Sequence, residues 1–340
     1  MTFNEGIRVQ EALTCLLCDR EGRVLYRDLR DRQFDAPGTW ELLHCSGCGF
    51  VWLNPRPIAA DVGRLYQTYY IHDAAHSVPR LASVRSRVRD SVLVAQLGYK
   101  GLGNSPLQRS LGKVVSFIGP IREGVEIDVM TLNAQERGKL LDVGCGNGKF
   151  LAKMRELGWV VYGVEPDGQA VKAAREWFGL DVHEGNLYKA SFPSNTFDAI
   201  SMNHVIEHVL EPIGLLEECQ RVLKPSGRLV VVTPNIQSLG HRLFKESWAA
   251  LNPPHHLYLF SPESLSQAMV TSGFSVLDLR CIAKGAGGNY AMSRCIRSGR
   301  KPLRNHISDV LGIIFAAVER FAMTFNNEVG EHIILSATRR

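Results

Sequence analysis

The stretch Leu140-Leu-Asp-Val-Gly-Cys-Gly-Asn-Gly148 decides the fold of this 340-residue chain. The apolar residues before Gly144 predict a buried strand, and the three alternating glycines predict a sharp turn into a helix. The N–H groups at the start of such a helix have no partner within the helix, so a ligand can bind to them. Asp142, near the end of the strand, can accept a hydrogen bond from an ammonium group.

Strand and helix patterns alternate regularly around this turn. We expect strands at 139–143, 159–164, 180–183, 197–202, 228–233, 274–282 and 331–338, and helices at 149–157, 168–178 and 262–272. This alternation predicts an α/β fold, a Rossmann-like, seven-stranded, mostly parallel sheet with helices on both faces. The last two strands are separated by an insertion at 284–329, in which we expect one amphipathic helix at 307–325.

An acidic residue ends the second expected strand. Glu165 comes 21 residues after Gly144, and an acid at this place can hold both hydroxyls of a ribose. A dinucleotide turn has the spacing G-x-G-x-x-G, whereas the third glycine here comes one residue early, and a P-loop is absent. The turn alone leaves open a nucleotide site or a plain strand-to-helix connection.

Further motifs follow the turn in a fixed order. They are Val164-Glu-Pro166, Glu184-Gly-Asn-Leu187, Phe197-Asp-Ala-Ile200, His204-Val-Ile-Glu-His208 and Leu223-Lys-Pro-Ser-Gly-Arg-Leu-Val-Val-Val-Thr-Pro234. With the D-x-G-x-G-x-G of the turn, this series resembles the class I S-adenosylmethionine (SAM) methyltransferases over residues 136–340.

The resemblance implies SAM as the cofactor. It places the glycine turn and Asp142 near the methionine moiety, Glu165 on the ribose diol, and Asn186 and Leu187 beside the adenine. The cofactor-binding positions that it implies are Asp142, Gly144, Cys145, Gly146, Gly148, Glu165, Asn186, Leu187 and Asn203. Because SAM carries an activated methyl group, the protein has only to align an acceptor with the sulfur–methyl bond and, where needed, remove a proton.

Two C-x2-C pairs lie near the N-terminus, with 26 residues between them. Four thiolates from two such pairs can build a closed tetrahedral zinc site, which is structural because no coordination position stays open. The ligands are Cys15, Cys18, Cys45 and Cys48, and the intervening piece is expected to be a hairpin. Two disulfides are the alternative, but a reducing compartment disfavours them.

The second cysteine pair runs into Asn54-Pro-Arg-Pro57 and a tyrosine-rich stretch at Tyr66, Tyr69 and Tyr70. This arrangement resembles a subgroup of bacterial methyltransferases with an N-terminal zinc ribbon, among them sugar C-methyltransferases and enzymes of surface-glycan and natural-product pathways. The resemblance places His208 and His256 at the acceptor. Because His255 stands where the sugar C-methyltransferases have Glu, O- or N-methylation is favoured over C-methylation.

We expect the acceptor's proton to be handled by His256, His208 or His255, with Tyr258 as a helper. All four are expected in loops at the carboxyl edge of the sheet, where ligands of open α/β folds bind. An imidazole near its ordinary pKa of about 6.5 suits this task. His204-Val-Ile-Glu-His208 also spells the H-x-x-E-H of inverted zinc proteases, an interpretation that the methyltransferase context disfavours.

Positive charge is concentrated in one segment. Residues 78–122 hold eight Lys or Arg and one Asp, a net charge of +7, although the whole chain carries only +5. We therefore divide the chain into a zinc ribbon at 1–57, a basic helical linker at 58–130 and a methyltransferase domain at 131–340. The basic segment and the helix at 307–325 could bind an anionic membrane surface bearing a lipid-linked substrate.

The sequence predicts a SAM-dependent methyltransferase for a small-molecule, sugar or glycan acceptor. One alternative is an RNA methyltransferase that uses the ribbon and the basic segment, although no base-methylation motif supports a nucleic-acid partner. Another is a non-catalytic SAM-binding regulator. No secretory signal or membrane-spanning run stands out, so we expect a cytoplasmic protein, or one peripheral to the inner face of the membrane.

Overall fold

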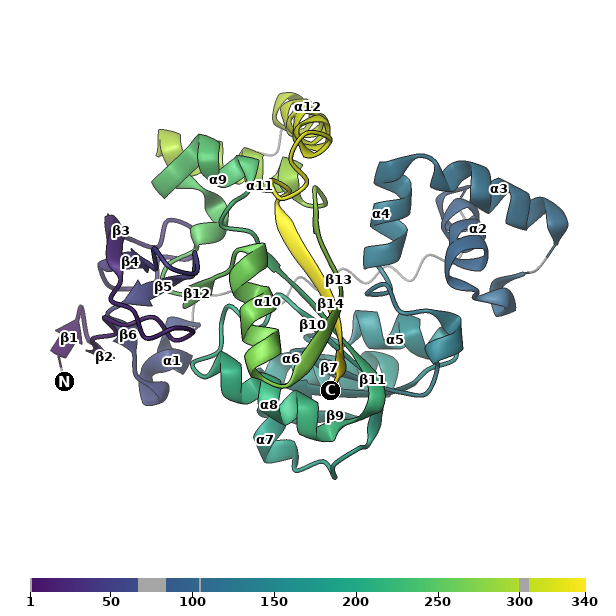
Figure 1. The fold of residues 1–340 in the computed structure, drawn as a ribbon, viewed down its shortest axis with the longest axis horizontal. Helices are drawn as coiled ribbons and strands as arrows, with labels where there is room; N and C mark the ends of the chain where they lie inside the picture. The colour runs from purple at the N-terminus through teal and green to yellow at the C-terminus, as the bar shows by residue number, and fades with distance from the viewer. Residues whose placement is uncertain (1, 67–83, 104, 300–305) are drawn as a thin grey trace. The chain divides into compact units, whose positions relative to one another are not determined.

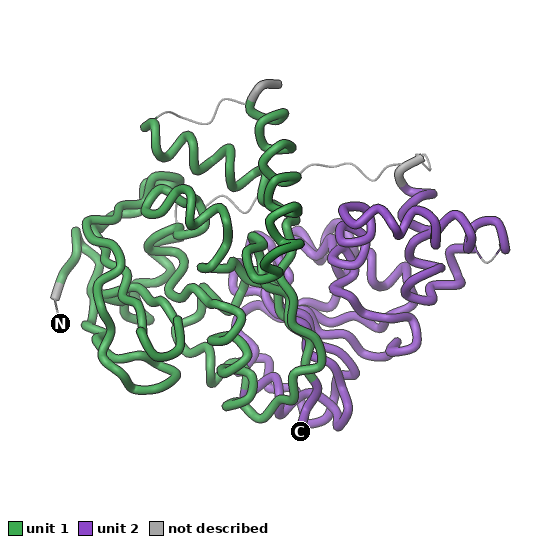
Figure 2. The backbone as a smooth tube through the Cα atoms, turned by 45° about the horizontal axis from the view of Figure 1, so that its top comes forward, with its two compact units in different colours: residues 1–70, 203–216, 231–337 green, residues 71–202, 217–230, 338–340 purple. Residues whose placement is uncertain are grey.

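The computed structural model describes residues 2–66, 84–103, 105–299 and 306–340 (Figure 1). Tyr69, Tyr70 and Arg80 lie outside the described residues. The chain divides into two compact units (Figure 2): unit 1 comprises 1–70, 203–216 and 231–337, and unit 2 comprises 71–202, 217–230 and 338–340.

One seven-stranded sheet has the strand order β13-β14-β11-β10-β7-β8-β9. The pairings β10–β7, β7–β8 and β8–β9 are parallel, and the predicted α/β class is confirmed. The strands are β7 (Lys139–Val143), β8 (Val160–Glu165), β9 (Val182–Glu184), β10 (Phe197–Asn203), β11 (Leu223–Pro234), β13 (Phe274–Ile282) and β14 (His332–Arg339).

Helices connect these strands, and capping residues set several of their ends. The helices are α5 (Lys149–Glu156), α6 (Gly168–Phe178), α7 (Leu187–Ala190), α8 (Pro212–Val222), α9 (Leu239–Phe244) and α10 (Pro262–Thr271), with 3₁₀ turns at Lys245–Ser247 and Ala249–Leu251. Asp167 caps α6, and Gly179 ends that helix in the left-handed conformation. Ser261 and Ser264 form a reciprocal capping box at the start of α10.

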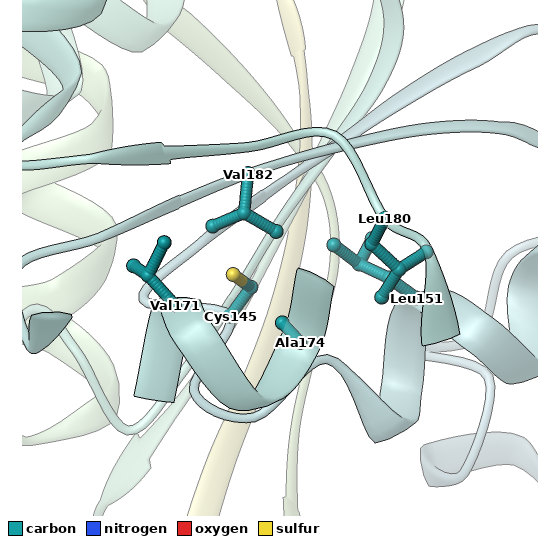
Figure 3. Packing of buried hydrophobic residues seen from close by; sticks show 6 residues of the cluster. All are labelled: Cys145, Leu151, Val171, Ala174, Leu180 and Val182. Atoms are coloured by element: carbon teal, nitrogen blue, oxygen red, sulfur yellow. The ribbon is translucent and has the colours of Figure 1, made fainter. Parts of the chain in front are cut away.

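A small apolar core in unit 2 lies under the glycine-rich turn (Figure 3). Its buried members are Cys145, Leu151, Val171, Ala174, Leu180 and Val182. Gly148 lets the turn pack closely on α6, because a Cβ there would lie 2.5 Å from Leu180 and 2.9 Å from Ala174. Its φ of 79° is a second reason for glycine at this position.

Unit 1 contains the cysteine-bearing segment and two further sheets. The strands are β1 (Thr2–Asn4), β2 (Ile7–Gln10), β3 (Arg23–Leu29), β4 (Trp40–His44), β5 (Val51–Asn54), β6 (Arg56–Pro57) and β12 (Tyr258–Leu259), and α1 (Ala59–Leu65) follows them. The antiparallel pair β3–β4 confirms the hairpin predicted between the two cysteine pairs. The sheet β12-β5-β4-β3 also includes residues 258–259, which are some 200 positions further along the chain.

In the basic linker predicted at 58–130, the residues that the structure describes are largely helical, as predicted. Its elements in unit 2 are α2 (Val84–Leu97), a 3₁₀ turn (Lys100–Leu102), α3 (Pro106–Ser116), α4 (Gly119–Ile127) and a second 3₁₀ turn (Ala134–Glu136). On α3 and just after it, Leu107, Val114 and Phe117 are exposed by 80%, 65% and 89%. This surface therefore combines basic with large apolar side chains.

The insertion before the last strand holds two helices, so the expectation of a single helix is wrong. These are α11 (Ala286–Ser298) and α12 (His306–Met323). The two backbones approach closely where Gly287 faces Gly312, since a Cβ on either would lie 2.7 Å from the other's carbonyl oxygen. Phe315 is buried in this packing, whereas Ile313 and Phe321 are exposed. No helix in the described part of the chain is long and apolar enough to span a membrane.

Candidate functional site

The glycine-rich turn of unit 2 has the left-handed backbone that its sequence predicts. The φ angles of Gly144, Gly146 and Gly148 are 71°, 53° and 79°. The N–H groups of Gly144 and Cys145 both donate to the carbonyl of Val164, which ties the turn to the end of β8. The side chain of Cys145 points into the apolar core (Figure 3), so only its backbone remains for a ligand.

Glu165 closes the other side of this turn. Its two carboxylate oxygens accept hydrogen bonds from the N–H groups of Gly146 and Asp167, each at 2.9 Å. The side chain is buried, and burial raises the pKa of Glu165 above its ordinary value. Each oxygen keeps a second lone pair, so this held carboxylate can still accept from two hydroxyls.

Asp142 lies on β7 and is buried next to β10. Its carboxylate accepts a 2.6 Å hydrogen bond from the hydroxyl of Ser201. Burial raises the pKa of Asp142 to about 7. A cationic group bound beside Asp142 would favour its ionised form, which agrees with the expected role near an ammonium.

The remaining expected cofactor residues follow β9 and end β10. Asn186 is exposed and caps α7, with its side-chain oxygen accepting from the N–H of Lys189 at 3.0 Å. Leu187 is buried, and Asn203 is the exposed last residue of β10. A capping oxygen has one lone pair left, so the expected contact of Asn186 with an adenine amino group is compatible with its position.

The four N-terminal cysteines form one cluster in unit 1. Sγ–Sγ distances are 3.5 Å for Cys15–Cys48, 3.4 Å for Cys18–Cys45 and 3.8 Å for Cys18–Cys48. These exceed a disulfide bond of about 2.05 Å, and all four cysteines are free. Tetrahedral Zn–S bonds of about 2.3 Å place the sulfurs about 3.8 Å apart, so the cluster fits a zinc ion.

Backbone donors support the same interpretation of the cysteine cluster. The N–H of Leu17 points to Cys15 Sγ, and the N–H of Gly47 points to Cys45 Sγ, both at 3.4 Å. The first cysteine of each pair thus receives an N–H from the residue two positions on. Such donors stabilise thiolate charge at a metal centre.

Three histidines and a tyrosine of unit 1 gather around the segment before β12; we call His208, His255, His256 and Tyr66 the histidine cluster. His208 Nδ1 lies 2.9 Å from the carbonyl oxygen of His255 and 3.0 Å from the hydroxyl of Tyr66. The rings of His208 and His256 pack edge to face, with centroids 4.7 Å apart. The structure therefore brings the three predicted histidines together.

Glu207 lies beside this cluster, fully buried. Its carboxylate accepts from His204 Nδ1 at 2.9 Å and from the Thr233 hydroxyl at 3.0 Å. Burial alone would raise the pKa of Glu207, but the hydrogen bond from His204 and the charges that the neighbouring imidazoles carry in acid lower it to about 2. Glu207 is thus an anion among histidines.

The imidazoles do not keep the ordinary pKa assumed from the sequence. Burial lowers the pKa of His208 and His255, and it lowers that of His256 to about 3. All three are therefore neutral near pH 7, with a lone pair on one ring nitrogen.

Tyr258 lies in β12 and pairs in register with Trp52 of β5. Its hydroxyl donates to the carbonyl of Leu210 at 2.9 Å and accepts from Arg56. Burial raises the pKa of Tyr258. These bonds anchor the segment that follows the histidines.

Sequence reasoning missed Glu207, Thr233 and the bonding role of Tyr66. The available signal for Glu207 was its place in the H-x-x-E-H motif, directly after an apolar strand. Thr233 gave no signal, because it looks like one more residue of a β-branched run.

Comparison with known proteins agrees with this geometry. Residues 112–279 match the family model described as "Methyltransferase domain". This region includes the glycine-rich turn, Glu165 and the histidine cluster apart from Tyr66. The enzyme class supported by this domain is that of the class I SAM-dependent methyltransferases.

Two relatives illustrate the similarity. The human mitochondrial ubiquinone biosynthesis O-methyltransferase is 33% identical over 153 residues, which cover 41% of this chain and 42% of that protein. A probable S-adenosylmethionine-dependent methyltransferase of Mycolicibacterium smegmatis is 31% identical over 149 residues, 44% of this chain and 56% of that protein. The chain thus spans about half the length of these relatives.

A solved SAM-dependent methyltransferase of Archaeoglobus fulgidus is similar over 60% of this chain and 86% of its own, with 21% identity and a TM-score of 0.42.

Proposed function

We propose that this protein transfers the methyl group of SAM to a hydroxyl or amine of a small-molecule, sugar or glycan acceptor. The observation that carries the proposal is the buried Glu165 carboxylate, which is hydrogen-bonded to the glycine-rich turn of a matched methyltransferase domain. Asp142, the turn, Asn186, Leu187 and Asn203 bind the cofactor in this proposal.

The histidine cluster and Glu207 form the acceptor side. Neutral imidazoles beside an anionic carboxylate can orient a hydroxyl and take up its proton as the methyl group moves. The acceptor oxygen forms the new bond to carbon, the carbon–sulfur bond breaks, and its electron pair stays on sulfur, which leaves S-adenosylhomocysteine. The names of the O-methyltransferase relatives favour a hydroxyl acceptor.

The cysteine cluster holds one structural zinc ion in this proposal. Four thiolates leave no open coordination position, so zinc stabilises the ribbon and takes no part in the chemistry. Through β5, the ribbon supports β12, which follows the histidines directly. Zinc thereby helps to hold the acceptor side in place.

The deciding experiment is a SAM-consumption screen over nucleotide sugars, polyprenyl-linked sugars, phenols and RNA. Formation of S-adenosylhomocysteine together with a methylated small molecule is the expected result. Tight SAM binding with no product from any acceptor would indicate a SAM-binding regulator, and product from RNA alone would indicate an RNA methyltransferase.

A lipid-linked acceptor is favoured within this screen by the surface of α3. Described residues 86–122 carry six Lys or Arg and one Asp, a net charge of +5, next to exposed Leu107, Val114 and Phe117. An anionic membrane surface matches both the charge and the apolar groups, whereas RNA matches only the charge. Sedimentation with anionic vesicles should weaken in Phe117→Ser and persist in Phe3→Ser, which alters an exposed phenylalanine of the other unit. Equal sedimentation of the two variants would contradict membrane binding by α3.

A further inference from the structure

Glu207, His208 and His256 bring one carboxylate and two imidazoles together in unit 1. Their ligand atoms all lie within 4.8 Å of one another. Among the described residues, only the four cysteines form another cluster of this kind. The members come from two places, the turn after β10 and the segment before β12, so the fold assembles them.

The hydrogen bonds of the two imidazoles fix their tautomers. His208 Nδ1 lies 2.9 Å from the carbonyl oxygen of His255, and His256 Nδ1 lies 2.8 Å from that of Ala250. A carbonyl oxygen can only accept, so each Nδ1 carries the hydrogen and each Nε2 carries the lone pair. Histidines that bind metals typically donate their other ring N–H to a carbonyl or carboxylate in this way.

Hydrogen bonds orient the carboxylate of Glu207, as they orient the two imidazoles. His204 Nδ1 donates to one oxygen and the Thr233 hydroxyl to the other. The backbone carbonyl of Glu207 accepts from the N–H groups of Leu257 and Tyr258, which joins the turn to the residues just after His256. Each carboxylate oxygen has a second lone pair, so both can accept a further partner.

We propose that Glu207, His208 and His256 bind one divalent first-row cation of the zinc class. Two imidazoles and one carboxylate are a ligand set of catalytic zinc sites, in which the fourth position stays open. Metal–ligand bonds of about 2.0–2.2 Å hold tetrahedral ligands about 3.3–3.6 Å apart, so ligand atoms that now lie within 4.8 Å of one another would move closer together around the ion.

This inference rests on the proposed function in one respect, which is that the acceptor would bind at the open fourth coordination position of the cation. An acceptor hydroxyl bound there would lose its proton more readily, because the cation would stabilise the resulting oxygen anion. With the cation bound, His208 and His256 would act as its ligands in place of taking up the proton, because each has only one ring nitrogen with a lone pair. The site differs from the H-x-x-E-H pattern seen in the sequence, because His204 donates to Glu207 and the third ligand comes from the distant His256.

The test is the stoichiometry of Co²⁺ binding to the full chain by equilibrium dialysis. Wild type should bind two equivalents, one at the cysteines and one at this site. His256→Ala should bind one, and Cys48→Ala should lose the other. His183→Ala, a histidine of unit 2, should still bind two. A single equivalent in wild type, or two in His256→Ala, would overturn the proposal, and the wild-type count decides even if a variant unfolds.

A positioning variant adds a second measurement. Thr233→Val removes the hydroxyl that orients Glu207 and keeps the side-chain shape. Loss of such an orienting partner typically weakens metal affinity about 10–100-fold, and we expect a loss in this range for the second equivalent. Thr338→Val removes a hydroxyl that donates to the Gly227 carbonyl and should leave both equivalents unchanged. Unchanged affinity in Thr233→Val would contradict Glu207 as a ligand.

The inference and the proposed function can fail separately. Methyl transfer by protein that binds one equivalent of Co²⁺ would refute the cation site and leave the activity. Two equivalents without methyl transfer to any acceptor would refute the activity and leave the cation site.

Discussion

The carboxylate of Glu165 accepts a hydrogen bond from the backbone N–H of Gly146 at 2.9 Å. This bond joins the end of β8 to the middle glycine of the turn that follows β7. A second N–H, from Asp167, holds the other carboxylate oxygen at the same distance. The protein's own backbone therefore holds both oxygens of this acid beside the turn, so binding a ribose diol requires little ordering of its side chain.

Replacing Glu165 with Ala should weaken SAM binding at least tenfold. Each hydrogen bond to a charged group contributes about 1.5–3 kcal/mol, and about 1.4 kcal/mol corresponds to a factor of ten. Calorimetry with SAM and S-adenosylhomocysteine measures the loss. Glu184→Ala is the matched control, because Glu184 pairs in register with Glu165 on β9 but is exposed. Equal affinity of Glu165→Ala and wild type would refute the cofactor assignment.

One zinc ion per chain should be bound by Cys15, Cys18, Cys45 and Cys48. Removing it with a chelator should loosen the first 57 residues and leave SAM binding intact, because unit 2 has its own core around Leu151 and Val171. Elemental analysis of Cys48→Ala against Cys219→Ala, which alters a buried cysteine outside the cluster, isolates this site. Reduced wild-type protein without zinc would rule it out.

Regular local patterns made much of the fold predictable. The turn at Gly144–Gly148, the helix 168–178 and the strand 274–282 were predictable from the sequence. Their signals, which are the spacing of apolar residues and the residues that cap a helix, lie within the segments themselves or next to them. The helix α11 was missed, since Gly287 reads as a helix breaker. In the structure this glycine lets α11 and α12 approach closely, a tertiary reason that local propensity does not contain.

The candidate acceptor side was predictable in composition but not in bonding. His208, His255 and His256 stood out as polar residues in loops, whereas their hydrogen-bond partners are backbone carbonyl oxygens. The pairing of Tyr258 with Trp52 joins residues about 200 positions apart. No periodic pattern encodes such a pairing, because it depends on where the whole chain folds back.

His256→Ala should lower turnover by about 10²–10⁴, the range typical of losing a group that handles the acceptor's proton. His208→Ala is the second choice and should lower turnover in the same range. SAM affinity should stay nearly unchanged, since the residues around the glycine turn bond to one another within unit 2. Steady-state kinetics with calorimetry separates the two effects. His183→Ala serves as the control for loss of an imidazole. Turnover within about threefold of wild type in both cluster variants would place the acceptor elsewhere.

Glu331 should make the stability of unit 1 depend on pH. Burial raises the pKa of this carboxyl to about 7 from an ordinary 4.5, although Asn289, Trp248 and Ser238 donate hydrogen bonds to it. The other acid facing it is Glu319 of α12, which accepts from the backbone N–H of Glu331.

Between pH 4.5 and about 7 the folded state keeps the Glu331 proton that the unfolded state has lost. Stability should therefore fall as pH rises through this window, by at most about 1.4 kcal/mol per pH unit for one proton. Glu331→Gln should flatten this slope. Glu328→Gln is the control, because it alters a less buried acid three residues earlier in the chain, and it should keep the slope. Denaturant titrations at several pH values provide the measurement. A slope in Glu331→Gln equal to that of wild type would show that another group is responsible.

Gly163 of β8 leaves the space that the Cys145 side chain occupies. A Cβ at position 163 would lie 2.6 Å from Cys145 Sγ and 2.9 Å from Leu151 Cδ1, closer than packed atoms allow. Gly163→Ala should therefore destabilise unit 2 by about 1–3 kcal/mol, the usual cost of overpacking a core. The effect should be smaller in a Cys145→Ala background, because the shorter side chain removes the sulfur, and the difference measures the coupling of the two positions.

Gly124→Ala is the control: it lies within α4 with open space around its Cβ, so it should be neutral or stabilising by up to about 1 kcal/mol. Equal destabilisation by Gly163→Ala with and without Cys145 would show that the strain does not arise from this contact.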